Sequence, residues 1–225
     1  KVYAATVITA LTAQNTKGVF KVLNIPSNFI EEQIKVIAKD LDISFIKIGM
    51  LSNQSVIKTV TNSLNIYLPN IPIVLDPVMV AKGGHPLLEN KAINLLKKNL
   101  MTKSFLITPN LLEAEKISKL LLDKKVTRDF NVLLKGGHLL KSEKVTDLLF
   151  SEGKVFKFYS KRINTNNTHG TGCSLASAIT ANLFLGKSLK ESIKVSRKFV
   201  NTAIKSSYEI GYGHNPINHF VNIKS

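Results

Sequence analysis

Short apolar runs alternate along almost the whole of this chain with longer segments of helical periodicity. The run IPIVLDPV at 71–78 is almost continuously apolar, which is typical of a strand in a sheet covered on both faces. Similar strand-length runs occur at 6–12, 45–49, 104–109 and 131–137, with a hairpin at 145–160, and helical patterns occur at 28–41, 52–66, 87–99, 111–122, 172–185 and 189–207. Repeated strand–helix units predict an α/β fold with a mostly parallel sheet between two helical layers.

Length and composition fit one globular domain covering residues 1–225. The chain has 44% hydrophobic residues, which is enough for a sizeable core. No run of 18 apolar residues is present, so we expect no membrane span and no membrane partner. The single cysteine, Cys173, excludes an internal disulfide and a multi-cysteine metal site, which favours a reducing, cytoplasmic location.

The chain is strongly basic, with 31 Lys and Arg against 15 Asp and Glu and a formal net charge of +16. Such an excess can indicate nucleic acid, an anionic surface or a phosphorylated ligand, or it can reflect compositional drift. The lysines are dispersed, and no block of five or six like charges occurs. We therefore expect no nucleic-acid partner, while attraction of a phosphorylated small molecule stays open.

Polar residues follow several of the expected strands. Because ligands gather outside the carboxyl ends of parallel strands, these residues are candidates for one site. They are Asp76 after IVL, Glu113 one turn beyond Thr108-Pro109-Asn110, Lys135 in LLKGGH, and the turn Gly170-Thr171-Gly172 before Cys173. Two acids, a cation and a glycine-lined helix start are the set that a magnesium-nucleotide site needs.

The glycine turn has two interpretations. Free N–H groups at a helix start stabilise an anion, and glycine lets the backbone approach it closely. The tripeptide can equally be a tight strand–helix turn, since it matches neither a Walker A loop nor G-x-G-x-x-G. Cys173 in the first helical turn would have a thiol pKa lowered by the helix dipole, or would be a small buried hydrophobe.

The charged candidates also have structural alternatives. Asn110 and Glu113 have the spacing of a capping box, which would explain both residues without any ligand. Asp76 before Pro77 could be a turn residue, and Lys135 could place its charge in solvent. As functional groups, the acids would hold Mg²⁺, partly through water, and Lys135 would neutralise phosphate charge.

Seven segments of the chain resemble the ribokinase-like superfamily, and within it the hydroxymethylpyrimidine/phosphomethylpyrimidine kinases of thiamin biosynthesis. The GTGC tetrapeptide is specific, because many sugar kinases of the superfamily have aspartate at the position of Cys173. The segments are VITALTAQNT (7–16), IKIGML (46–51), VLDPVMVAKGG (74–84), ITPNLLEAEKI (107–117), LLKGGHL (133–139), RINTNNTHGTGC (162–173) and GYGHNPINHF (211–220).

This resemblance implies a three-layer α/β/α fold, often dimeric, that transfers phosphate from magnesium-ATP to 4-amino-5-hydroxymethyl-2-methylpyrimidine and then to its monophosphate. By similarity, Cys173 is the catalytic base, and Gly170, Thr171 and Gly172 form the anion hole. Similarity also places Lys135 at the nucleotide phosphates, Asp76 and Glu113 at the metal, and Gln14, Met50 and Val78 around the pyrimidine.

The sequence departs from the family at two places. Family members begin with a strand and a glycine-rich segment ahead of the position of Lys1, and we expect a chain without them to have an open pocket. Gly84-His85 stands where the family often has Gly-Asp. Two alternatives stay open: a pyridoxal kinase on the same fold, and a non-catalytic basic protein that has kept the fold.

Overall fold

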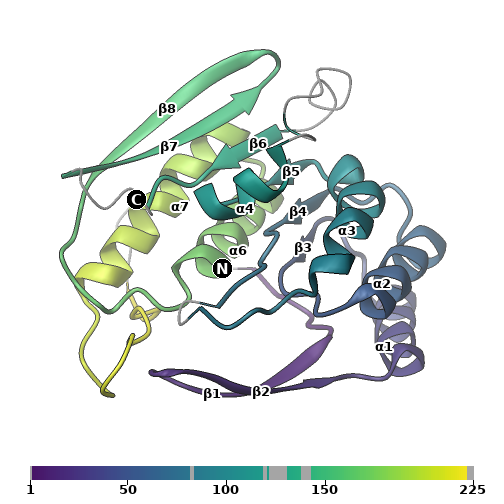
Figure 1. Ribbon diagram of the computed structural model, residues 1–225. Coiled ribbons are helices and arrows are strands. Elements are labelled where there is room, and N and C mark those ends of the chain that lie inside the picture. Colours follow the sequence, from purple (N-terminus) through teal and green to yellow (C-terminus); the bar gives the residue numbers. More distant parts are fainter. Residues whose placement is uncertain (1, 82–83, 119–120, 122–130, 138–142, 222–225) are drawn as a thin grey trace.

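The computed structural model describes residues 2–81, 84–118, 121, 131–137 and 143–221. A six-stranded sheet with the order β3-β4-β5-β6-β7-β8 forms its centre (Figure 1). The strands are β3 (Ile46–Ile48), β4 (Ile73–Leu75), β5 (Leu106–Ile107), β6 (Asn131–Leu134), β7 (Lys144–Ser151) and β8 (Lys154–Lys161). Neighbours from β3 to β6 are parallel, whereas β6–β7 and β7–β8 are antiparallel. The predicted hairpin at 145–160 is thus confirmed, and the strands end sooner than the apolar runs suggested.

Helices cover both faces of this sheet, which confirms the expected three layers. Residues alternate between the faces, as a period of two requires. Leu75, Ile107 and Val132 face one hydrophobic cluster, which they share with the first helices of the chain. Val74, Leu106 and Leu133 face the other cluster, which contains the last two helices.

The helices of the first layer are α1 (Ser27–Asp40), α2 (Gln54–Tyr67), η1 (Asn90–Ala92) and α3 (Ile93–Asn99), and those of the opposite layer are α6 (Thr171–Phe184) and α7 (Leu189–Lys205). A further short 3₁₀ turn, η2 (Met101–Lys103), precedes β5, and α4 (Leu111–Lys116) follows it. The sequence pattern predicted a helix over 111–122, whereas α4 ends at Lys116. Positions 119, 120 and 122 of that range lie outside the described residues.

Side-chain caps fix several helix starts. The side chains of Asn53, Asn110 and Ser188 each accept a backbone N–H of the first turn, at α2, α4 and α7. Asn28 and Glu31 have the spacing of a capping box and would make Asn28 the N-cap of the first helix. This expectation is wrong, because the N-cap of α1 is Pro26, two residues earlier. The proline ring has no hydrogen-bond acceptor, so no side-chain cap is made there.

Residues 6–12 do not form a strand of the central sheet as expected. Instead, β1 (Ala10–Asn15) pairs antiparallel with β2 (Gly18–Asn24), a segment in which the sequence pattern predicted no strand. Figure 1 shows this hairpin, in purple, apart from the central sheet and near the yellow segment that follows α7. A β-branched run predicts an extended backbone but not the strand with which it will pair.

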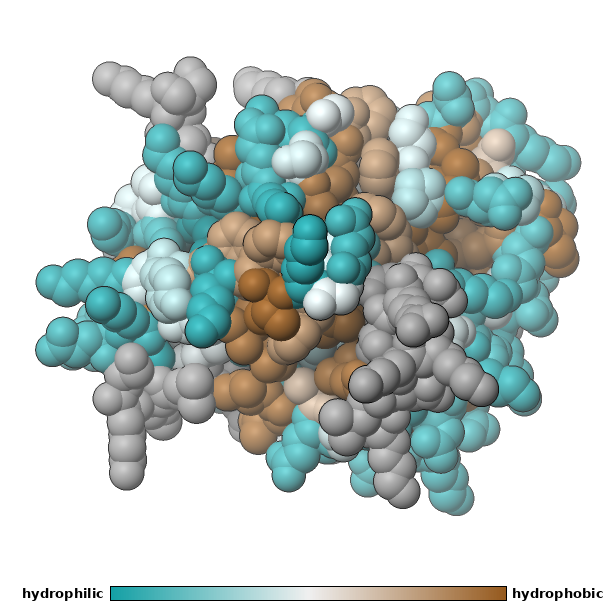
Figure 2. Space-filling model, turned by 90° about the horizontal axis from the view of Figure 1, so that it is seen from above, coloured by the Kyte–Doolittle hydropathy of each residue, from teal (hydrophilic) through white to brown (hydrophobic). Residues whose placement is uncertain are grey.

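The molecular surface is mixed in character. Figure 2 shows one face on which hydrophobic residues gather in the middle and hydrophilic residues form most of the border. In the parts of the chain that the structure describes, no helix is both long and apolar enough to cross a membrane.

Candidate active site

Asp76 and Lys135 meet at the carboxyl ends of β4 and β6. The Nζ of Lys135 lies 2.6 Å from Oδ1 of Asp76, and the Asp76 side chain is only 2% exposed. Thr108, which follows β5 between them, donates its hydroxyl to the same carboxylate oxygen at 3.2 Å. Asp76, Thr108 and Lys135 continue the alternation of Val74, Leu106 and Leu133, so all three face α6.

Glu113 joins this cluster through a capping box. Its Oε2 accepts the N–H of Asn110 at 2.8 Å, while Asn110 Oδ1 accepts the N–H of Glu113 at 2.9 Å. Burial raises the pKa of the Glu113 carboxyl, and the charge of Asp76 raises it further. Lys135 and backbone N–H groups of Asn110 and Met79 oppose that rise. The structural and functional interpretations of Glu113 therefore coexist, because the cap holds the carboxylate beside Asp76 and Lys135.

The glycine turn opens α6 directly above these groups. Gly170 is the N-cap and has a φ of 83°, a left-handed conformation that favours glycine. A Cβ placed on Gly172 would lie 3.3 Å from Lys135 Nζ and 3.8 Å from Asp76 Oδ2. The absence of a side chain at Gly172 thus leaves room between the helix start and the ion pair. Thr171 closes the turn by donating its hydroxyl to the Thr168 carbonyl at 3.0 Å.

Cys173 lies at the surface of this site, in the first turn of α6. The expected lowering of its thiol pKa by the helix dipole is wrong. Desolvation by the surrounding protein raises the pKa of the Cys173 thiol, and the charge and hydrogen bonding of Asp76 raise it as well. Lys47 and Lys135 act in the opposite direction. Burial of the thiol, together with the nearby carboxylate of Asp76, thus outweighs the dipole of the helix.

Lys47 is a site residue to which the sequence pattern assigned no role. It pairs in register with Val74, so its side chain lies on the α6 face of the sheet. Its Nζ lies 2.6 Å from the position that a Cβ of Gly49 would occupy, so the side chain reaches toward the carboxyl end of β3. A lysine inside the otherwise apolar run FIKIG was the available signal.

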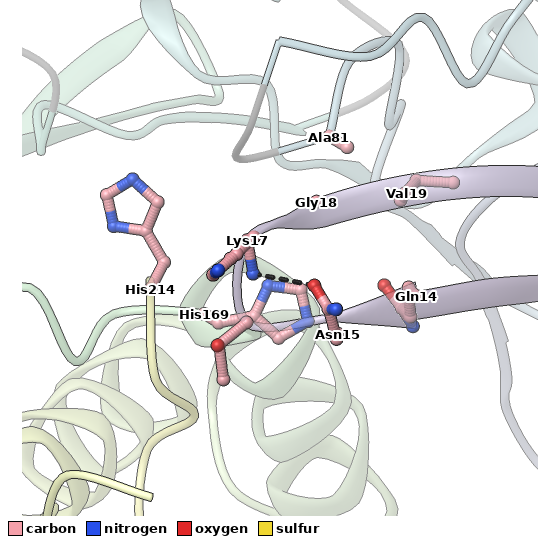
Figure 3. A pocket seen from close by; sticks show the side chains of 9 residues that line it. Gln14, Asn15, Lys17, Gly18, Val19, Ala81, His169 and His214 are labelled. Atoms are coloured by element: carbon pink, nitrogen blue, oxygen red, sulfur yellow. Dashed lines mark hydrogen bonds between the residues drawn. The ribbon is translucent and has the colours of Figure 1, made fainter. Parts of the chain in front are cut away.

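The three expected pyrimidine-contacting residues lie in two places. Met50 and Val78 follow β3 and β4 near Asp76, whose N–H binds the carbonyl of Ile48 at 2.9 Å. Gln14 is exposed near the tip of the β1–β2 hairpin. There it lines a small recess with His169 and Ala81 (Figure 3). Gln14 therefore lies beside the glycine turn rather than in the Asp76–Lys135 cluster.

The segment after α7 connects the hairpin to the glycine turn. His214 donates its backbone N–H to the Thr16 carbonyl at 2.7 Å, and Gly213 donates its own to the Thr16 hydroxyl at 3.2 Å. The same segment accepts the N–H of His169 through the carbonyl of Asn215. Figure 3 shows the hairpin turn, His169 and His214 gathered around one recess. Sequence reasoning used the segment GYGHNPINHF only as a resemblance and did not find this connection.

The acidic residues suit a magnesium ion better than a transition metal. Among the described residues, no group of three or more His, Cys, Asp or Glu side chains is arranged to hold a metal. Magnesium needs only one or two carboxylates, with water and phosphate oxygens completing its shell. Asp76 Oδ2 faces the open space at Gly172, and Glu113 is close enough to affect the same charges. These residues fit that requirement.

Comparison with known proteins shows to which family the chain belongs. A family model described as phosphomethylpyrimidine kinase matches residues 1–218. The hydroxymethylpyrimidine/phosphomethylpyrimidine kinase of Haemophilus influenzae is 39% identical over 97% of this chain and 86% of its own length. A bifunctional thiamine biosynthesis protein of Geobacter sulfurreducens is also 39% identical over 97% of this chain, but the chain spans only 46% of that protein.

Two solved structures share the fold. The phosphomethylpyrimidine kinase of Clostridium difficile is 34% identical with a TM-score of 0.75, covering 90% of this chain and 87% of that one. The pyridoxal kinase of Bacillus subtilis, in an ADP complex, is 29% identical with a TM-score of 0.83, covering 97% and 86%. By sequence match over nearly its whole length, the chain belongs to the phosphomethylpyrimidine kinase family.

Proposed function

We propose that this protein phosphorylates 4-amino-5-hydroxymethyl-2-methylpyrimidine and its monophosphate, using ATP and Mg²⁺, in thiamin biosynthesis. The observation that carries the proposal is the grouping of Asp76, Lys135 and Gly172 next to Cys173 at the start of α6. It matches what phosphoryl transfer requires, which is mainly positioning and neutralisation of negative charge.

In this mechanism the chain's own groups each have one task. The N–H groups of Gly170, Thr171 and Gly172 and the ammonium of Lys135 stabilise charge on the transferred phosphoryl group. Cys173 takes the proton of the attacking hydroxyl in the first transfer. Because its thiol pKa is raised in the free protein, we propose that Cys173 acts as base only after bound ligands have changed the charge around Asp76.

Magnesium would be held by Asp76 and Glu113, in part through water. When bound, it would neutralise the phosphate oxygens of ATP. Gln14 would hydrogen-bond the aminopyrimidine edge, since an amide offers a donor and an acceptor together. Met50 and Val78 would contact the faces of the ring from the ends of β3 and β4.

A pyridoxal kinase activity is the competing proposal. It is favoured by the TM-score of 0.83 to the Bacillus subtilis pyridoxal kinase, against 0.75 to the phosphomethylpyrimidine kinase. The higher identity to pyrimidine kinases weighs against it, at 39% against 29%. The two activities differ in the ring that is recognised and share the phosphate chemistry.

The test is ATP-dependent phosphorylation followed by mass spectrometry, with hydroxymethylpyrimidine, its monophosphate and pyridoxal supplied separately. We expect the wild-type protein to form the diphosphate from each of the first two substrates. We expect the Cys173→Ala variant to bind nucleotide but to transfer phosphate to the alcohol at least about 100-fold more slowly. Phosphorylation of pyridoxal alone would transfer the assignment to a pyridoxal kinase. Undiminished transfer by Cys173→Ala would remove Cys173 from the mechanism.

We also propose that residues 1–225 act as one kinase domain in the cytoplasm, as a homodimer. The dimer is supported by apolar residues on the β1–β2 hairpin, because Leu11, Phe20 and Leu23 are 51%, 68% and 59% exposed. Sedimentation equilibrium tests this: Phe20→Ser should shift the protein toward monomer, and an unchanged mass would argue against the hairpin as interface.

A further inference from the structure

One row of polar side chains crosses the carboxyl ends of four neighbouring strands. In the order of the sheet it runs from Lys47 on β3 through Asp76 and Thr108 to Lys135 after β6. All four side chains lie on the face that α6 covers. The row therefore has a cation at each end and one carboxylate between them, directly below the first turn of α6.

The two cations of this row differ in their partners. Lys135 forms a 2.6 Å ion pair with Asp76. Lys47 has neither a hydrogen bond nor an ion pair with any of the residues that the structure describes, although it is half-buried. A partly buried charge without a partner costs free energy, so a site that retains one is suited to an anion.

The position of Lys47 selects which anion this would be. Its Nζ lies beside Gly49, one residue before Met50, at the β3 end of the row. Lys135 occupies the β6 end and lies beside Gly172 of the glycine turn. Phosphates of the nucleotide bound to the glycine turn would therefore be next to Lys135. An anion next to Lys47 would come from the acceptor molecule.

We propose that Lys47 binds the phosphate already carried by the monophosphate substrate and so favours the second phosphoryl transfer. This inference rests on the proposed function. In that transfer, an oxygen of the acceptor phosphate donates an electron pair to the γ-phosphorus of ATP. The bond from that phosphorus to the β–γ bridging oxygen breaks, and ADP leaves with the electron pair.

The two transfers then depend on different residues. The alcohol must lose a proton as it attacks, and Cys173 lies where it can accept one. A phosphate oxygen is already deprotonated at neutral pH and needs no base, but its negative charge repels the incoming phosphates. Lys47 offsets that repulsion. One site would thus serve two acceptors, with Cys173 used for the first and Lys47 for the second.

The test measures kcat/KM for each acceptor with wild type, Lys47→Met and Cys173→Ala. Losing a charge-assisted hydrogen bond should reduce the ratio of monophosphate to alcohol phosphorylation by about 30-fold in Lys47→Met. Cys173→Ala should change the same ratio in the opposite direction. Lys58→Met is the matched control, because Lys58 is exposed on α2, outside the site, and should leave the ratio unchanged.

A second measurement separates this inference from the proposed function. Titration calorimetry with the monophosphate, in the absence of nucleotide, should show about 30-fold weaker binding to Lys47→Met than to wild type. If wild type phosphorylates neither pyrimidine, the proposed function fails. The calorimetric comparison alone then shows whether Lys47 binds the phosphate of the monophosphate. A ratio of activities unchanged in Lys47→Met, or equal affinity for the monophosphate, would overturn the inference. Thermal unfolding of each variant establishes that it is folded.

Discussion

Lys135 Nζ lies 2.6 Å from Asp76 Oδ1, although the two residues are 59 positions apart in the chain. The pair joins the ends of β4 and β6 across β5, where Thr108 donates to the same oxygen. It therefore holds together the part of the sheet edge on which the proposed transfer takes place. Its charges also act on Cys173 and Glu113, so the ion pair is the electrostatic centre of the site.

Breaking this pair should cost considerable stability. Lys135→Met leaves the buried carboxylate of Asp76 without its cation, and we expect the free energy of unfolding to fall by about 3 kcal/mol. Adding Asp76→Asn should restore part of that loss, because the uncompensated charge is removed. Urea denaturation at pH 7 measures both variants.

The control is the exposed pair of Lys187 and Glu191, which lie 3.4 Å apart. Lys187→Met should cost less than about 0.5 kcal/mol. Equal losses for Lys135→Met and Lys187→Met would show that burial adds nothing to the cost of breaking the Asp76–Lys135 pair.

Glu113 should make stability depend on pH in a definite direction. Its folded-state pKa is raised above the ordinary value of 4.5, so between these two values the folded protein binds more protons than the unfolded chain. Stability is therefore lost as pH rises from 4.5 through the raised pKa. Glu113→Gln keeps an acceptor for the capping box but has no charge to bury, so its melting temperature relative to wild type should increase from pH 4.5 to pH 7.5.

Differential scanning calorimetry at both pH values makes this comparison. Glu115→Gln is the matched control, since Glu115 is exposed on the same helix and should show no such increase. A relative melting temperature of Glu113→Gln that stayed constant or fell with pH would show that Glu113 is not destabilised by burial.

Cys173 should react slowly with alkylating reagents at neutral pH. It is the only cysteine of the chain, so the rate of iodoacetamide modification reports on this one thiol. Because its pKa is raised above the ordinary value of 9.0, the rate in the folded protein should reach its midpoint above pH 9. The urea-unfolded chain provides the reference. A midpoint below 9 in the folded protein would mean that the helix dipole and the two lysines prevail over burial and the charge of Asp76.

The contact between the hairpin and the C-terminal segment should affect substrate affinity more than folding. A Cβ on Gly213 would overlap the Thr16 backbone. We therefore expect Gly213→Ala to displace the hairpin that carries Gln14 and to raise the KM for hydroxymethylpyrimidine about tenfold, equivalent to about 1.4 kcal/mol. Gly18→Ala is the control in the same hairpin, because a Cβ there meets nothing within 4 Å. If both variants have the wild-type KM, the hairpin does not position the substrate.

Local pattern alone determined the layers and most of the elements. The apolar run IPIVLDPV indicates a strand covered on both faces, strand geometry then places Val74 and Leu75 on opposite faces, and the helical periods mark the elements that cover them. Capping at Asn110 and the need for glycine at Gly170 are also local. Sequence reasoning could find them because each depends on residues within one turn or strand.

The tertiary structure decided what depends on distant neighbours. Of the expected strand at 6–12, only residues 10–12 lie in a strand, and packing alone places them in a hairpin that the C-terminal segment holds. The helix dipole at Cys173 follows from sequence, whereas the opposing carboxylate of Asp76 comes from another strand. Lys47 is merely one lysine in an apolar run until the register with β4 turns it toward α6. Charge interactions extend through space, so their sum at one atom is fixed only when the chain is folded.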